Sequence, residues 1–195
     1  MHNIYDCVDA FSHLLYTQYE ITLGRKGVAV TLKILFDKRD CFHLMGLQYL
    51  TDREELTRDR TIVFDEIKNR KINNKHLENS KFYEKIRERV NMLPLLETLF
   101  DSNETIFKYN SKRNSFSLIQ ADYLMKNQVE DKSAFIFLSN EKEDIYFCRS
   151  FFTEGKMDYS KNQPSWTLLY KKKIDLVSQT EIVLYDRMKY KRILS

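Results

Sequence analysis

The sequence predicts an α+β fold, in which helices near the N-terminus, with an added β-hairpin, pack on an antiparallel β-sheet. Within residues 3–17, 41–50 and 62–100, apolar side chains recur at the three- and four-residue spacing of amphipathic helices. From residue 104 onward the pattern changes to strand-like segments separated by polar turns. Helices followed by consecutive strands favour segregated layers, and 195 residues suffice for a single domain (1–195) to bury a core.

The N-terminal segment 1–36 is expected to form a helix and a hairpin. Residues 3–17 have helical spacing, and two β-rich stretches, YEITLG and VAVTLKILF, follow on either side of Arg25, Lys26 and Gly27. The glycine supplies the positive φ that a tight hairpin turn needs. Residues 37–40 offer capping side chains ahead of a short helix in CFHLMGLQYL.

Residues 62–100 are expected to be helical in three pieces. These are IVFDEIKNR, a short turn at residues 76–80, and KFYEKIRERVNMLPLLETLF. Pro94 is expected to kink or divide the last piece, because proline cannot donate the helical hydrogen bond. The predicted strands are ETIFKYN, FSLIQADYLMKN, SAFIFLSN, EDIYFCRSFF, SWTLLYKKKIDL and EIVLYD, and a basic tail occupies residues 186–195.

Composition excludes several classes of protein. The four glycines lie too far apart for a glycine-rich phosphate loop, and the three cysteines form no CxxC pair, so we expect neither a disulfide framework nor a metal site. Apolar runs are short and the N-terminus is acidic, which argues against a membrane span or signal peptide and favours the cytoplasm. The net charge of +4 (32 Lys+Arg against 28 Asp+Glu) is only mildly basic.

Two residues stand out as candidates for chemistry. His43, at the start of a predicted helix, could act as a general acid or base near pH 7, or could be a helix histidine bonded to a carbonyl. Arg149 interrupts the apolar face of a predicted strand, so it needs either a phosphate or a structural carboxylate partner. The hydroxyls of Ser150 and Thr153 could contact the same phosphate or satisfy the strand end.

Three further residues have weaker signals. Strand alternation in SWTLLYKKKIDL points Lys171 to one face, where a lysine could stabilise a pentavalent phosphorane, although such runs are more often solvated strand ends. Tyr123 and Lys126 in ADYLMKN add a phenol and an amine.

A resemblance adds to these observations. The strings FHLMGLQYL, IVFDEIKNRKI, SKFYEKIRERV, ETIFKYN, ADYLMKN, IYFCRSFF and DYSKNQPSWTLLYKKKI follow one another in this order. In this order and spacing they resemble the fourth phage-associated family of the barnase, EndoU, colicin and RelE-like nuclease superfamily. The match covers roughly residues 38–175, which would be a nuclease-like core carrying segment 1–36 as an extension.

The resemblance implies helices on one face of an antiparallel sheet of about four strands. It also implies a metal-independent endoribonuclease without cofactors, of the phage or mobile-element toxin or effector type, with RNA as substrate and a cognate inhibitor protein as a further partner. In that chemistry a ribose 2′-OH attacks the adjacent phosphate to leave a 2′,3′-cyclic phosphate. The alternatives are a noncatalytic RNA- or protein-binding module that keeps the fold, or a protein partner acting through the hairpin.

The resemblance also suggests roles for particular residues. His43 would be the acid or base and Tyr123 would face the cleft. Arg149, Ser150, Gln163 and Lys171 would then hold phosphate or substrate. Lys126 and Thr153, which the residues alone suggest, are the remaining candidates for substrate binding. Alternation places Arg149 and Ser150 on opposite faces, so both could line one cleft only where a β-bulge intervenes.

Overall fold

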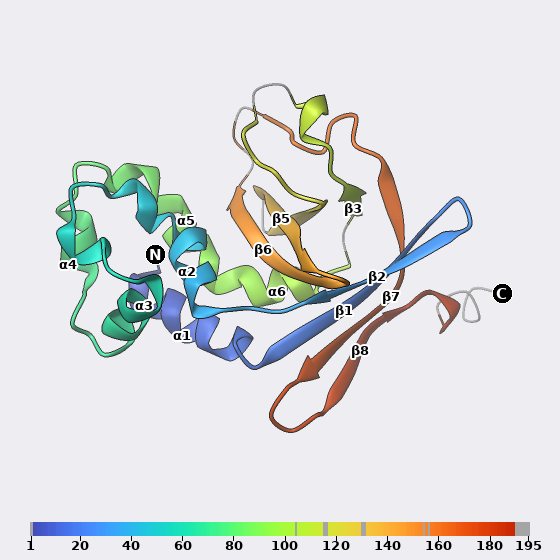
Figure 1. The fold of residues 1–195 in the computed structure, drawn as a ribbon, viewed down its shortest axis with the longest axis horizontal. Coiled ribbons are helices and arrows are strands. Elements are labelled where there is room, and N and C mark those ends of the chain that lie inside the picture. Colours follow the sequence, from blue (N-terminus) through green and yellow to red (C-terminus); the bar gives the residue numbers. More distant parts are fainter. Residues whose placement is uncertain are drawn as a thin grey trace.

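The computed structural model describes residues 2–103, 105–114, 117–129, 132–153, 155 and 157–189. Its helices gather on one side of the molecule and its strands curl round on the other (Figure 1). In these residues the helices are α1 (Ile4–Leu14), α2 (Lys38–Met45), α3 (Arg60–Lys68), α4 (Asn74–Glu78), α5 (Arg87–Met92) and α6 (Leu96–Asp101). Short 3-10 turns are η1 (Leu47–Tyr49), η2 (Glu54–Leu56), η3 (Tyr83–Lys85), η4 (Leu93–Leu95) and η5 (Ser111–Arg113).

The strands form one mixed sheet that closes on itself. They are β1 (Thr17–Arg25), β2 (Val28–Ile34), β3 (Thr105–Lys108), β4 (Tyr123–Val129), β5 (Lys132–Lys142), β6 (Ile145–Thr153), β7 (Ser165–Asp175) and β8 (Glu181–Asp186). Their order is β1-β2-β6-β5-β4-β3-β7-β8, and β1 pairs with β7 as well as β2. In the described part of the chain this additional pairing closes a barrel of seven strands, with β8 paired only to β7.

The expected combination of helices and a sheet is confirmed, but the antiparallel layer that we expected is not what forms. Strand β2 runs parallel to β6, with Lys33 opposite Ile145 and Ile34 opposite Tyr146. Backbone hydrogen bonds from Lys33 to Asp144 (2.9 Å) and from Leu35 to Tyr146 (3.1 Å) hold this junction. Segment 1–36 therefore supplies two neighbouring strands of the barrel, β1 and β2, and β1 is one of the two strands in the closing β1–β7 pair.

Local signals explain the N-terminal elements, and the predicted helix, hairpin and following short helix are confirmed. Asn3 and Asp6 form a capping box at the start of α1. The β1–β2 turn has Lys26 at φ 50° and Gly27 at φ 81°, the left-handed pair of a two-residue hairpin. Helix α2 ends at Gly46, whose φ of 81° suits glycine.

Pro94 divides the predicted long helix. It lies in η4, between α5 and α6, where its missing N–H breaks the helical ladder. The predicted strand FSLIQADYLMKN is shorter than expected, because pairing begins at Tyr123 and continues to Val129. Most of the predicted basic tail lies outside the described residues.

One apolar core joins the helices to the barrel interior. The ring of Phe100 in α6 stacks on Tyr19 of β1 at 5.1 Å and meets Phe36 edge-on at 5.3 Å. The carbonyls at the end of α6 receive donors from the barrel wall, namely the amide of Asn127 and the ammonium of Lys171. Helix α6 is thus fixed to the barrel by both packing and capping.

A smaller cluster lies on another face of the sheet. The buried side chains of Tyr109, Leu124, Phe135 and Phe137 form it, with Phe152 and Tyr159 packed against them. Strands β4 and β5 are therefore apolar on both faces. None of the described helices is long and apolar enough to cross a bilayer.

Candidate active site

Strand β6 carries a bulge at the point where the candidate residues lie. Phe137 of β5 is opposite Ser150, and its neighbour Leu138 is opposite Cys148, so Arg149 is an extra residue on β6. The bulge turns Arg149 outward, where it is exposed rather than buried on an apolar face. Arg149 and Ser150 nevertheless line two different hollows.

We call the first of these the His43 hollow. It has a volume of about 430 Å³ and lies where α2, the start of α3 and β6 meet. The side chains that matter for its chemistry are Asp40, His43, Arg60, Glu141, Phe147 and Arg149. Two of the predicted site residues, His43 and Arg149, are therefore brought together from positions far apart in the chain.

The electrostatics of the His43 hollow favour a neutral imidazole at pH 7. Burial lowers the pKa of His43 below its ordinary 6.5, and the cations of Arg60 and Arg149 lower it further, against a smaller opposing effect of Gln48. Among the described residues no carboxylate forms an ion pair with Arg149 or Arg60. Both guanidinium groups can therefore accept an anion in the hollow.

Asp40 has the opposite shift. Burial raises the pKa of Asp40 to about 6, with repulsion from Asp37 and Glu141 adding to the rise and the backbone N–H of Asp37 opposing it. That N–H donates to Asp40 at 2.9 Å as part of the α2 capping box. Since Asp40 and His43 are three residues apart on α2, they share one helix face, so one hollow presents an acid and a base.

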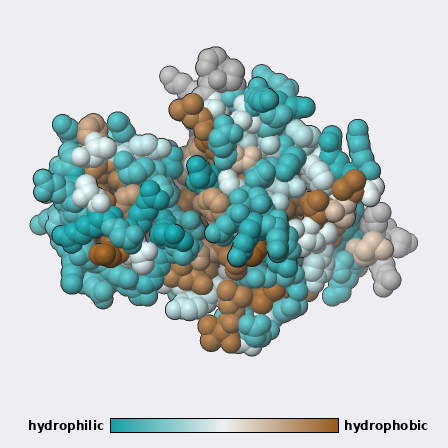
Figure 2. Space-filling model, viewed as in Figure 1, coloured by the Kyte–Doolittle hydropathy of each residue, from teal (hydrophilic) through white to brown (hydrophobic). Residues whose placement is uncertain are grey.

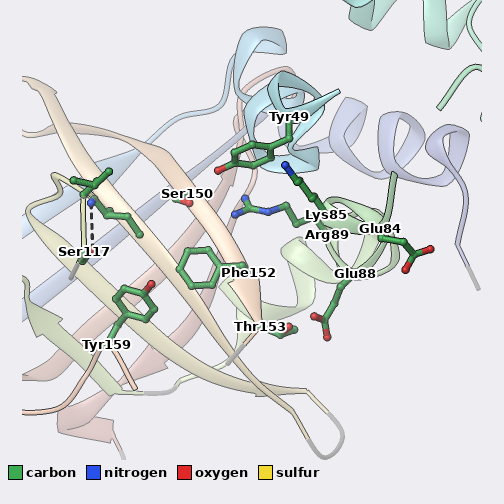
Figure 3. A pocket seen from close by; sticks show the side chains of 12 residues that line it. Tyr49, Glu84, Lys85, Glu88, Arg89, Ser117, Ser150, Phe152, Thr153 and Tyr159 are labelled. Carbon is green, nitrogen blue, oxygen red and sulfur yellow. Dashed lines mark hydrogen bonds between the residues drawn. The ribbon is translucent and has the colours of Figure 1, made fainter. Parts of the chain in front are cut away.

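The second hollow, which we call the Arg89 hollow, has a volume of about 520 Å³. It lies farther along β6 and is lined chiefly by Tyr49, Arg89, Ser150, Phe152, Thr153 and Tyr159 (Figure 3). The predicted residues Ser150 and Thr153 are found here. In the space-filling view the surface is notched between the helical side and the barrel (Figure 2).

Two predicted catalytic residues, Tyr123 and Lys171, lie in the interior, which corrects the expectation that they face a substrate cleft. Tyr123 is 3% exposed and packs in the core against Tyr146 and Trp166. Lys171 is 1% exposed and donates to the carbonyl of Ser102 at the end of α6. Burial lowers the pKa of Lys171 to about 8. Both side chains point inward because the sheet closes, so neither lines either hollow.

Two predicted substrate-binding residues also have structural partners. The amide of Gln163 pairs with the backbone of Asn110 at 2.9 Å and 3.0 Å, tying the loop before β7 to the loop after β3. The ammonium of Lys126 lies 3.1 Å from the carboxylate of Asp158. Neither side chain lines either hollow.

Comparison with known proteins identifies the family. A family model described as phage-Barnase-EndoU-ColicinE5/D-RelE like nuclease4 (PBECR4) matches residues 3–188. The chain belongs to this family. No curated protein and no solved structure matches the chain.

The PBECR4 match begins at the residue before α1 and ends after β8, so it includes the hairpin segment that the sequence resemblance left outside. The family name supports a phage nuclease. Sequence reasoning missed Asp40, Arg60 and Glu141 as lining residues of the His43 hollow. Asp40 had a usable signal in its three-residue spacing from His43, whereas Arg60 and Glu141 reach the hollow through tertiary packing.

Proposed function

We propose that this PBECR4 protein is a metal-independent endoribonuclease whose reaction takes place in the His43 hollow. The observation that carries the proposal is a half-buried imidazole, neutral at pH 7, that shares its hollow with the guanidinium groups of Arg60 and Arg149, neither of which forms an ion pair with a carboxylate of the described residues. A neutral imidazole can accept a proton, and planar guanidinium forks fit phosphate oxygens. The family name supports a phage nuclease. The proposal adds that it is an effector acting on RNA in the cytoplasm, and that a cognate inhibitor protein would cover this hollow.

The proposed reaction is an intramolecular transesterification. His43 takes the proton of the ribose 2′-OH as that oxygen bonds to phosphorus. Arg60 and Arg149 stabilise the negative charge that develops on the phosphorane. The bond between phosphorus and the 5′-oxygen then breaks, and Asp40, whose pKa of about 6 leaves it partly protonated, gives its proton to the 5′-oxygen. The products are a 2′,3′-cyclic phosphate and a 5′-hydroxyl end.

The first experiment is to incubate the protein with mixed RNA in excess chelator and to identify the new end groups. We expect cleavage to 2′,3′-cyclic phosphates, and no cleavage of 2′-O-methyl RNA or DNA, because both lack the attacking hydroxyl. His43→Ala should lose roughly 100- to 10,000-fold in rate, as is typical of a missing general base. The matched control is His13→Ala, an exposed histidine on α1 away from the hollow.

The same experiment separates the alternative of a noncatalytic binding module. In that case wild type and His43→Ala would both bind RNA, with affinity falling linearly in log salt, and neither would cut it. Cleavage that needs a divalent cation would instead contradict the metal-independent mechanism.

A further inference from the structure

The Arg89 hollow has no role in the chemistry above. We propose that it binds an unpaired nucleobase of the RNA strand whose phosphate occupies the His43 hollow. This inference rests on the proposed function for its choice of ligand, but its support is the geometry around Arg89.

Arg89 of α5 lies between two aromatic rings. Its guanidinium carbon is 5.5 Å from the ring centre of Tyr49 and 5.3 Å from that of Phe152. Figure 3 shows the guanidinium between these two side chains. One of its nitrogens donates to the carbonyl of Phe151 at 3.1 Å. The group is therefore held in place by stacking and by one hydrogen bond, which leaves other N–H donors for a ligand.

Arg89 also lacks a counter-charge among the described residues. The nearby carboxylate of Glu84 pairs with Arg87 at 3.1 Å, and the carboxylates of Glu84 and Glu88 point away from the guanidinium (Figure 3). Burial lowers the pKa of Arg89. A desolvated cation without an acidic partner is costly, so a ligand that brings acceptor atoms would lower its free energy.

The walls of the Arg89 hollow select a flat ligand. The ring of Tyr159 meets that of Phe152 at 5.3 Å and 70°, and Tyr49 is 42% exposed at the rim. The hydroxyls of Ser150 and Thr153 complete the lining. Aromatic faces and an arginine plane stack on nucleobases, while N–H and O–H groups match base edges. A phosphate alone would leave the aromatic rings unused.

The two hollows are adjacent along β6. Arg149 lines the His43 hollow, and the next residue, Ser150, lines the Arg89 hollow. The two hollows therefore share the Arg149–Ser150 segment of β6 as a common wall. The helices that carry the two sites also touch, since a Cβ at Gly46 would come within 2.9 Å of Cδ of Arg89. An RNA strand that crosses β6 can thus place a phosphate at Arg149 and the neighbouring base beside Arg89.

The test measures binding without cleavage. Fluorescence anisotropy is recorded with a short 2′-O-methyl RNA, and with versions in which one base at a time is replaced by an abasic unit. One abasic position should weaken wild-type binding roughly tenfold, since stacking of a base on an aromatic side chain is typically worth about that much or more. Tyr49→Leu should weaken binding of the intact RNA roughly tenfold, and that abasic position should cost it nothing further.

Controls separate base binding from other effects. Tyr16→Leu changes a comparably exposed tyrosine (58%) outside both hollows and should bind RNA as wild type does. The salt dependence of Tyr49→Leu should match wild type, because its phosphate contacts are intact. Thermal unfolding confirms that both variants are folded.

Two outcomes would overturn the inference. In the first, the abasic unit weakens RNA binding by the same factor in wild type and in Tyr49→Leu. In the second, Tyr49→Leu and Tyr16→Leu bind the intact RNA with equal affinity, and the hollow would then be left to another class of ligand such as an acidic peptide. RNA cleavage without the abasic pattern would refute this inference alone. The abasic pattern without cleavage would refute the proposed chemistry alone.

Discussion

Lys171→Met should stabilise the protein at neutral pH and leave RNA cleavage intact. The ammonium of Lys171 is buried at the end of α6, with the carbonyl of Ser102 as its acceptor. Methionine has a similar length and no charge, so it removes the cost of burying a cation. If Lys171 instead acted on the phosphate in a catalytic cleft, Lys171→Met would lose RNA cleavage.

The magnitude follows from the pKa of Lys171. That pKa falls from 10.5 to about 8 in the folded protein, and at about 1.4 kcal/mol per pH unit the difference corresponds to about 3 kcal/mol. The substitution also leaves the carbonyl of Ser102 without this donor, which costs about 1–3 kcal/mol. We therefore expect Lys171→Met to be about 1 kcal/mol more stable than wild type at pH 7.

The pH dependence gives a sharper test, because the carbonyl cost is independent of pH. Between about pH 8 and 10.5 the unfolded chain holds a proton on Lys171 that the folded chain has lost, so wild-type stability gains from rising pH there. The advantage of Lys171→Met should accordingly shrink across this window and reverse by roughly 2 kcal/mol at its upper end.

The assay is urea unfolding at pH 7, 8, 9 and 10, with RNA cleavage measured on the same samples. Lys173→Met is the matched control on the same strand, since Lys173 pairs with Glu97 at 2.6 Å and Asp101 at 3.0 Å. These carboxylates raise the pKa of Lys173 despite its burial, so its removal should destabilise the protein at pH 7. A stability difference for Lys171→Met that stays constant from pH 7 to 10, or a folded Lys171→Met without nuclease activity, would refute the reasoning.

Three further predictions concern the two hollows. The pH–rate profile should be bell-shaped, because the rate falls as pH rises through about 6, when Asp40 deprotonates, and falls at lower pH, when His43 is protonated. In Asp40→Asn, which keeps the helix cap, the fall on the alkaline side should disappear, and a fall that persists would show that Asp40 is not the acid. Gly46→Ala should cost roughly 2 kcal/mol in urea unfolding, since it places a side chain at positive φ against Arg89, and an unchanged midpoint would contradict this contact. Arg149→Gln should weaken binding of noncleavable RNA and lower the slope of log affinity against log salt by about 0.7, whereas an unchanged slope would show that Arg149 makes no phosphate contact.

Local sequence signals were enough for the elements and the family. The capping residues before α1 and α2, the Lys26-Gly27 turn and Pro94 each act on neighbouring backbone groups, so their effects can be predicted without tertiary structure. The ordered series of segments also pointed to the nuclease family that the match over residues 3–188 shows.

The tertiary structure decided which strand edges meet and therefore which side chains share a hollow. Alternation along β7 and β4 shows that Lys171 and Tyr123 each lie on one face of their strand. The closure of the barrel decides that, in each strand, the face carrying this residue is turned to the interior. Closure depends on the parallel β2–β6 and antiparallel β1–β7 pairings between distant segments. Backbone hydrogen bonds of this kind are made by any residue, so the amino-acid pattern carries little record of the partner. The position of Arg60 was likewise not predictable from the sequence, because Arg60 reaches His43 only through the packing of α3 beside α2.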